Sequence, residues 1–158
     1  MRTLKFATSD KNQLHFSAAV RKNVNDYFKE KGIPQTANYA MVLQTIVMLS
    51  LYIVPFILIL TIPMNIWVAL GLVIVMGLGT AGIGMSVMHD AVHGSYSRKE
   101  WVNKMFGSSM YLLGSNVFNW KVQHNILHHT NTNIDGFDGD IDSKGPIRLS
   151  HSAPYKKF

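Results

Sequence analysis

The chain has 158 residues, the length of one ordinary domain, with a net charge of +6; 47% of the residues are hydrophobic and only 15% are charged. It has no cysteine, which excludes disulfide frameworks, thiolate metal sites and iron–sulfur clusters. Because the basic residues flank apolar runs, we expect them to meet anionic lipid or a phosphorylated ligand, with no nucleic-acid partner.

The first segment, residues 1–38, is polar and basic. Apolar residues recur at helical spacing between Ser17 and Lys31, and Gly32 and Pro34 follow as stop signals. The segment is too polar for a cleavable signal peptide. It predicts an amphipathic helix that lies in the membrane interface on the cytosolic side.

Two long apolar runs follow, Tyr39–Leu60 and Ile66–Met88. From Gly32 through His89 there is no Asp, Glu, Lys or Arg, so neither run has the solvated face that a soluble helix needs. As a helix each run would measure roughly 33–35 Å, enough to cross a ~30 Å hydrocarbon core. The short connector predicts a helical hairpin. Four glycines in the second run permit close helix contact: Gly77, Gly79, Gly82 and Gly84.

The distribution of Lys and Arg predicts the topology. Seven precede the first span, none lies in the connector, and eight follow the second span. By the positive-inside rule, both termini and the histidine-rich segments of this multi-pass integral membrane protein face the cytosol. Residues 98–120 predict a further helix that lies in the interface, where Trp101 and Tyr111 suit the depth.

Five of the seven histidines lie in two arrays that begin where the second span ends. His89 and His93, and likewise His124 and His128, are four residues apart and share one face of a helix. His129 points about 100° further round the helix than His128 and is expected to reach a second metal. Imidazoles without thiolate suit iron, zinc or copper, and five nitrogens exceed the needs of one tetrahedral zinc, so the arrays predict a two-metal centre. The other two histidines match neither array: His15 and His151.

Other metal sites fit the spacing less well. A zinc peptidase helix needs Glu directly after the first His, where this chain has Asp90 and Asn125. A pair of haem ligands would need single histidines facing one another within the membrane. The acidic run that starts at Asp138 lacks the Gly and Glu of an EF-hand, since Ser143 and Leu149 occupy those positions.

Two motifs carry a resemblance to a known family. "HDAVH" at 89–93 and "HNILHH" at 124–129 resemble the first and second histidine boxes of membrane fatty acid desaturases. "HHTNTN", followed by Asp138–x–Asp140, resembles the acyl-lipid and acyl-CoA branch that contains the front-end desaturases. The resemblance covers nearly the whole chain from about Phe6 onward. It implies an all-α integral membrane fold in which residues 39–158 form half of a four-span domain.

The resemblance implies an oxidoreductase that uses O₂ and two electrons to insert a double bond into an acyl chain. The substrate would be a CoA thioester or a phospholipid within the membrane, and a separate ferredoxin or b-type cytochrome would supply the electrons. Carried over residue by residue, the expected ligands of two non-haem iron ions are His89, His93, His124, His128 and His129. Candidates for orienting these imidazoles through hydrogen bonds are Asp90, Asn125, Asn133, Asp138 and Asp140.

The family also has a third histidine box after a second membrane hairpin, and the sequence reaches Phe158 without either. We therefore expect an incomplete desaturase domain with only part of the ligand set, inactive alone. Two alternatives stay open. A membrane di-iron hydroxylase or related oxygenase would share the histidine boxes, and a non-catalytic membrane protein could bind metal through them.

Overall fold

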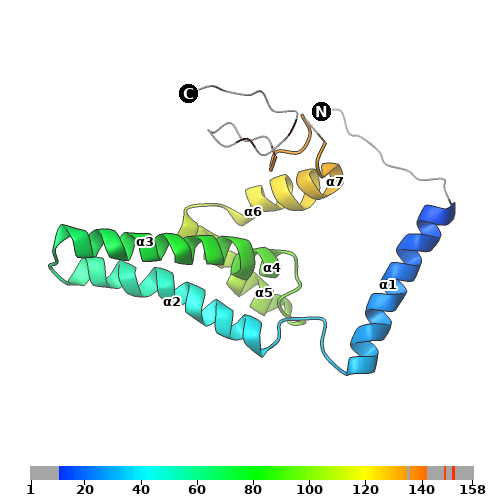
Figure 1. Ribbon diagram of the computed structural model, residues 1–158, viewed down its shortest axis with the longest axis horizontal. Coiled ribbons are helices and arrows are strands. Elements are labelled where there is room, and N and C mark those ends of the chain that lie inside the picture. Colours follow the sequence, from blue (N-terminus) through cyan, green and yellow to red (C-terminus); the bar gives the residue numbers. More distant parts are fainter. Residues whose placement is uncertain (1–10, 135, 142–147, 149–150, 152–158) are drawn as a thin grey trace. The chain divides into compact units, whose positions relative to one another are not determined.

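The computed structural model describes residues 11–134, 136–141, 148 and 151. Over these ranges the chain forms helices and turns without a strand, which confirms the expected all-α fold (Figure 1). The described residues fall into two units, one ending at Gln35 and the other beginning at Thr36. Expectations that concern residues 1–10, 142–147 and 152–158, including the start of the resemblance at Phe6, lie outside the described residues.

The N-terminal unit contains one described helix, α1, Lys11–Lys31, which begins earlier than the predicted Ser17. It ends as predicted at Gly32, whose φ of 62° is left-handed. The N–H of Ile33 donates to the carbonyl of Phe28 at 3.2 Å, a Schellman cap. An exposed apolar stripe runs along α1, and the interfacial location stays a prediction. The stripe consists of Phe16, Val20, Val24 and Tyr27.

The second unit begins with a helical hairpin, α2 (Tyr39–Thr61) and α3 (Ile66–Gly82), whose helices lie side by side in Figure 1. Each helix starts at an asparagine cap. Asn38 accepts the N–H of Met41 at 3.0 Å, and Asn65 plays the same role for α3. The helix α2 and the continuous helix Ile66–Val92, of which α3 is the first part, are both long and apolar enough to cross a membrane, so the predicted hairpin is confirmed.

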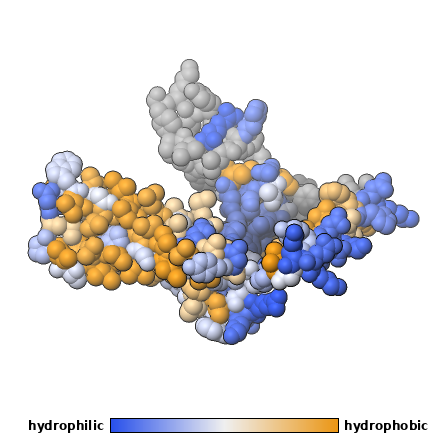
Figure 2. All heavy atoms as spheres, turned by 60° about the horizontal axis from the view of Figure 1, so that its bottom comes forward, coloured by the Kyte–Doolittle hydropathy of each residue, from blue (hydrophilic) through white to orange (hydrophobic). Residues whose placement is uncertain are grey.

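The hairpin turns most of its apolar side chains outward. Figure 2 shows hydrophobic residues covering its visible face. Leu60, Ile66 and Trp67 are 69%, 71% and 75% exposed. An apolar surface of this extent is costly in water and matches the interior of a bilayer, which supports association with a membrane.

The two helices pack closely at Gly79. A Cβ atom there would lie 2.7 Å from the backbone nitrogen of Tyr52, which leaves no room for any side chain. Gly82 lies against the side chain of Met48. Gly77, by contrast, has no heavy atom within 4 Å of such a Cβ. Of the glycines expected to permit contact within the hairpin, Gly79 is therefore the one that backbone packing requires.

The second membrane helix extends past the predicted end at Met88. It continues from α3 through η1, a π-helical turn over Ile83–Val87, into α4, Met88–Val92, as one helix. Gln44 of α2 donates its side-chain N–H to Ser86 at 3.1 Å. His89 therefore lies on the last turns of a packed helix rather than in a connection after it.

Two tyrosines attach the polar connections to α2. The Tyr96 hydroxyl donates to the buried hydroxyl of Thr45 at 2.9 Å. The Tyr52 hydroxyl donates to the carbonyl of Leu112 at 2.8 Å. These long-range hydrogen bonds fix the segments on either side of α5 to the hairpin.

The prediction of one helix over residues 98–120 is wrong. Gly114 adopts a left-handed φ of 71° and ends the helical run, and Asn116 starts a new helix by accepting the N–H of Phe118 at 2.8 Å. The chain instead forms three short helices: α5 (Glu100–Gly107), the 3₁₀ helix η2 (Ser108–Leu113) and α6 (Val117–Trp120).

The packing at Gly79 gives a test of the hairpin. We expect Gly79→Ala to destabilise the chain by ~1–3 kcal/mol because the new methyl group meets backbone atoms that cannot rotate away. Thermal unfolding in detergent micelles, followed by circular dichroism, measures the effect. Gly77→Ala is the matched control, since alanine there meets open space and favours the helix. Equal midpoints for the two variants would contradict this packing.

Candidate metal centre

The second histidine array lies on a helix whose pitch changes. After α6 the chain enters η3, a π-helix over Lys121–His128, and then α7, His129–Asn131. A π-helix bonds each residue to the fifth along the chain, so residues five apart come to one face. This pitch brings His129 close to His124, five residues before it, while the expected direction of His129 relative to His128 stays a prediction. The His129 ring lies 4.9 Å from the ring of His124, centroid to centroid.

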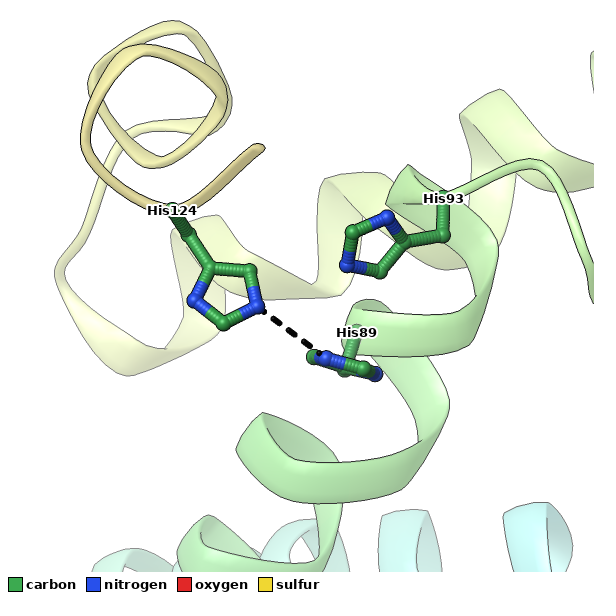
Figure 3. A group of neighbouring side chains, drawn as sticks. All are labelled: His89, His93 and His124. Carbon is green, nitrogen blue, oxygen red and sulfur yellow. Dashed lines mark hydrogen bonds between the residues drawn. The ribbon is translucent and has the colours of Figure 1, made fainter. Parts of the chain in front are cut away.

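The two arrays meet through the Nε2 atoms of their imidazoles. The Nε2 atoms of His89 and His124 lie 3.2 Å apart, as Figure 3 shows. Those of His93 and His129 lie 3.4 Å apart. His128 stacks on His124, with ring centroids 4.9 Å apart. The structure thus brings together all five histidines singled out in the sequence.

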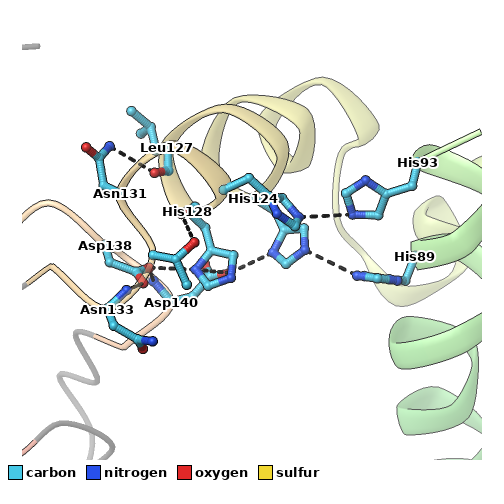
Figure 4. Close-up of polar contacts among 11 residues, drawn as sticks. His89, His93, His124, Leu127, His128, Asn131, Asn133, Asp138 and Asp140 are labelled. Carbon is cyan, nitrogen blue, oxygen red and sulfur yellow. Dashed lines mark hydrogen bonds and ion pairs between the residues drawn. The ribbon is translucent and has the colours of Figure 1, made fainter. Parts of the chain in front are cut away.

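Three of the five imidazoles each contact a carboxylate through Nδ1, and Figure 4 shows the two pairs that involve His124 and His128. Each pair is within hydrogen-bond or ion-pair distance, and each carboxylate comes from the same helix or from the turn after α7. The pairs are His89 with Asp90 at 3.1 Å, His124 with Asp140 at 2.6 Å, and His128 with Asp138 at 2.9 Å.

These carboxylates determine which nitrogen of each ring is free. An ionised carboxylate only accepts hydrogen bonds, so a neutral imidazole paired with it carries its proton on Nδ1 and a lone pair on Nε2. The lone pairs of His89 and His124 then face one another with no proton between them. Such a pair of acceptors suits a cation. Two nitrogens about 2.0–2.1 Å from one ion lie roughly 3–3.4 Å apart, in agreement with the distances found here.

Two groups of side chains have ligand atoms close enough to hold a metal ion, one of three histidines and one in which Asp140 joins two histidines. Those of His89, His93 and His124 lie within 4.8 Å of one another, and so do those of His124, His128 and Asp140. The two groups share His124. This donor set, imidazole with outer carboxylates and without sulfur, fits iron or zinc better than calcium or magnesium.

The surroundings of His93 lower its pKa. Burial lowers the pKa of His93, and positive charge on His89, His129 and His124 would lower it further, whereas Asp90 raises it. A lowered pKa keeps the imidazole neutral near neutral pH. Neutral imidazole is the form whose lone pair can coordinate a metal ion.

The two asparagines expected to orient the imidazoles differ in what they contact. The side-chain oxygen of Asn125 is buried without a hydrogen-bond partner among the described residues. Asn133 reaches the site through its backbone N–H, which donates to Asp138 at 2.7 Å. Trp120, missed in the sequence, stacks on His124 with ring centroids 4.6 Å apart. Its position four residues before a histidine on a helix was the available signal.

A cavity of about 360 Å³ opens beside His93. Polar and apolar side chains line it together, and two lysines give it positive charge. Lys104 forms an ion pair with Glu100 at 2.8 Å. The other lining residues include Asn103, Ser108, Tyr111, Val117 and Lys121.

Comparison with known proteins gives one family and several relatives. The family model described as fatty acid desaturase matches residues 65–157. The sn-1 linoleoyl-lipid 6-desaturase of Arthrospira platensis is 33% identical over 90% of this chain and 39% of its own length. The acyl-lipid (8-3)-desaturase of Physcomitrium patens is 32% identical over 91% of this chain and 30% of its own. A second sn-1 linoleoyl-lipid 6-desaturase, from a Synechocystis strain, is 33% identical over 85% of this chain and 38% of its own length.

The chain therefore spans less than two fifths of the length of these curated relatives, 39% of the first and 30% of the second. No solved structure matches it.

The position of His93 between rings of both arrays gives a test of the centre. We expect His93→Ala to weaken Co²⁺ binding by the purified chain in detergent micelles by ~10–100-fold or more. Loss of a residue that only hydrogen-bonds a metal ligand already costs that much, and loss of a ligand should cost at least as much. Titration followed by the visible absorption of Co²⁺ measures the affinity. His15→Ala is the control, because His15 belongs to the N-terminal unit and should leave the titration unchanged. An unchanged affinity in His93→Ala would remove His93 from the centre.

Proposed function

The chain belongs to the fatty acid desaturase family, and from this premise we propose that it supplies the membrane hairpin and two histidine arrays of an O₂-dependent acyl-lipid desaturase. The observation that carries the proposal is the convergence of five imidazoles from the two arrays, with Nε2 atoms 3.2 Å and 3.4 Å apart. Such an enzyme is an oxidoreductase. It removes two hydrogens from neighbouring methylene groups of an acyl chain and leaves a carbon–carbon double bond.

Non-haem iron is the proposed cofactor. Two iron ions would be held by His89, His93, His124, His128 and His129. When bound, they would supply the oxidising power that O₂ and two electrons give to the reaction. Neutral imidazoles add no negative charge, so this ligand set favours a strongly positive and oxidising centre. The carboxylates of Asp90, Asp138 and Asp140 would hold three of the rings in place through Nδ1.

The proposed substrate is an acyl chain carried on a membrane lipid. The names of the relatives, acyl-lipid and linoleoyl-lipid desaturases, support the lipid over a CoA thioester. The outward apolar surface of the hairpin suits acyl chains of the bilayer, and the cavity beside His93 offers a polar space next to the ligands. A chain held in one position beside the centre would determine which carbons react.

The proposed protein is multi-pass, with both polar ends on the cytosolic side, and takes electrons from a separate ferredoxin or b-type cytochrome. Because the chain spans 30–39% of its relatives' lengths, we propose that the complete ligand set includes histidines beyond the five found here. These 158 residues alone should then lack desaturase activity.

Fatty-acid profiling tests the function. We expect cells that express the complete gene to accumulate lipids with new double bonds, and His124→Ala to abolish them, because His124 belongs to both ligand groups. Gas chromatography with mass spectrometry of the lipid acyl chains identifies the products. His15→Ala is the control and should retain activity. Hydroxylated chains in place of double bonds would instead show a related oxygenase, and unaltered lipids would contradict both reactions.

Labelling of single cysteines tests the topology, because the chain has no native cysteine. We expect Met64→Cys, in the connector of the hairpin, to react with a membrane-impermeant maleimide on intact cells. Ser97→Cys, after the first array, should react only once the membrane is opened. The reverse pattern would place the histidines outside the cell and rule out this orientation.

A further inference from the structure

Asp138 is the one carboxylate of the site that is fully enclosed. The residue is 1% exposed, and its side chain is 0% exposed, against 37% for the side chain of Asp140. It lies in the turn after α7 and faces His128 on η3 (Figure 4). Because burial of an unpaired carboxylate is strongly unfavourable, its partners must account for its place in the fold.

Three N–H groups donate to this carboxylate. Oδ1 accepts from Nδ1 of His128 at 2.9 Å and from the backbone N–H of Asp140 at 3.0 Å. Oδ2 accepts from the backbone N–H of Asn133 at 2.7 Å, where the chain adopts a left-handed φ of 63°. Burial alone would raise the pKa of Asp138, but these hydrogen bonds outweigh burial and hold the pKa below its usual value. All three partners are donors, so the carboxylate serves only as an acceptor in this arrangement.

The same carboxylate connects two histidines. It binds His128 directly, and it also fixes the backbone of Asp140, whose own carboxylate binds Nδ1 of His124 at 2.6 Å. His124 and His128 stack with their rings 16° from parallel. Rotation of the His128 ring would break its hydrogen bond to Asp138. Rotation of the His124 ring would break its hydrogen bond to Asp140, whose backbone is held by Asp138.

We propose that Asp138 is a positioning residue that sets the orientation of two iron ligands, His128 directly and His124 through Asp140. This inference rests on the proposed function, since it assumes that the imidazoles bind metal. Asp90 and Asp140 differ from Asp138 in their contacts. Asp90 contacts His89 at 3.1 Å, whereas Oδ2 of Asp140 lies 2.6 Å from Nδ1 of His124 and 3.7 Å from Nδ1 of His128, a longer approach than the 2.9 Å between Asp138 and His128. Asp138 instead determines how η3 and the turn after α7 fit together.

Asparagine cannot replace this carboxylate although it has the same shape. All three groups around Asp138 are donors, whereas an amide offers one acceptor oxygen and an NH₂ group that is itself a donor. With its oxygen at the Oδ1 position, the amide leaves the N–H of Asn133 facing an NH₂ group; with its oxygen at Oδ2, it leaves His128 and the N–H of Asp140 without an acceptor. Because the amide oxygen is uncharged and can occupy only one of the two positions, Asp138→Asn weakens or removes the acceptor that keeps the proton of His128 on Nδ1.

The experiment compares Asp138→Asn with Asp140→Asn in the purified chain in detergent micelles. We expect Asp138→Asn to weaken Co²⁺ binding by about tenfold or more and Asp140→Asn to weaken it by a smaller factor. Without metal, ¹⁵N NMR of histidine-labelled chain at pH 8 should show His128 with its proton on Nδ1. In Asp138→Asn it should show a mixture of the two tautomers, a change that a purely structural role would not produce. Circular dichroism reports whether each variant keeps its helices.

Each outcome decides the inference. Unchanged Co²⁺ affinity and an unchanged His128 tautomer in folded Asp138→Asn would overturn it, while the metal centre itself would stand. If Asp138→Asn fails to fold, the NMR spectrum of Asp140→Asn decides. A mixture of tautomers at His124 alone supports the inference, whereas a mixture at both His124 and His128 overturns it. Failure of the unmodified protein expressed from the complete gene to bind Co²⁺ would instead overturn the metal centre, and this inference with it.

Discussion

The contact between His89 and His124, whose Nε2 atoms lie 3.2 Å apart, is the interaction on which the rest of the structure depends. Each ring donates a hydrogen bond from Nδ1–H to a carboxylate, so the facing Nε2 atoms are both acceptors. Two lone pairs at this distance repel unless a cation lies with them. In the proposed centre a metal ion would accept both lone pairs, and the free energy of metal binding would then add to the stability of the folded chain.

The membrane half of the fold was readable from the sequence because its signal extends over many residues. A charge-free stretch from Gly32 through His89 admits few structures other than spanning helices, and Gly32 marks the end of the helix before it by local chemistry. Residues 98–120 were misread because the apolar residues continue across Gly114. The left-handed turn there depends on Gly114 alone, and the spacing of apolar residues over several helical turns does not reveal a break at one residue.

The histidine centre was predictable in its members and not in its geometry. Spacing of four identifies pairs on one face, but the direction of His129 depends on a π-helical pitch that no residue type encodes by itself. Asp138 and Asp140 lie 10 and 16 residues beyond the histidines they bind. The turn that brings them back is a property of the folded chain, so the sequence could offer these carboxylates only as candidates among several polar residues.

The two halves of the centre are held by different forces. The first array follows a packed core, since Ile83, Val87, Met88 and Ala91 are all buried beside it. None of the residues of η3 is buried, so apolar packing contributes little to the orientation of the second array. Hydrogen bonds to carboxylates take that role, and hydrogen bonds fix direction more strictly than apolar contacts do. The first array thus ends a packed membrane helix, whereas the second is oriented by the carboxylates that hydrogen-bond its imidazoles. In the proposed centre these carboxylates matter as much as the imidazoles, because they set the direction of the ligand nitrogens.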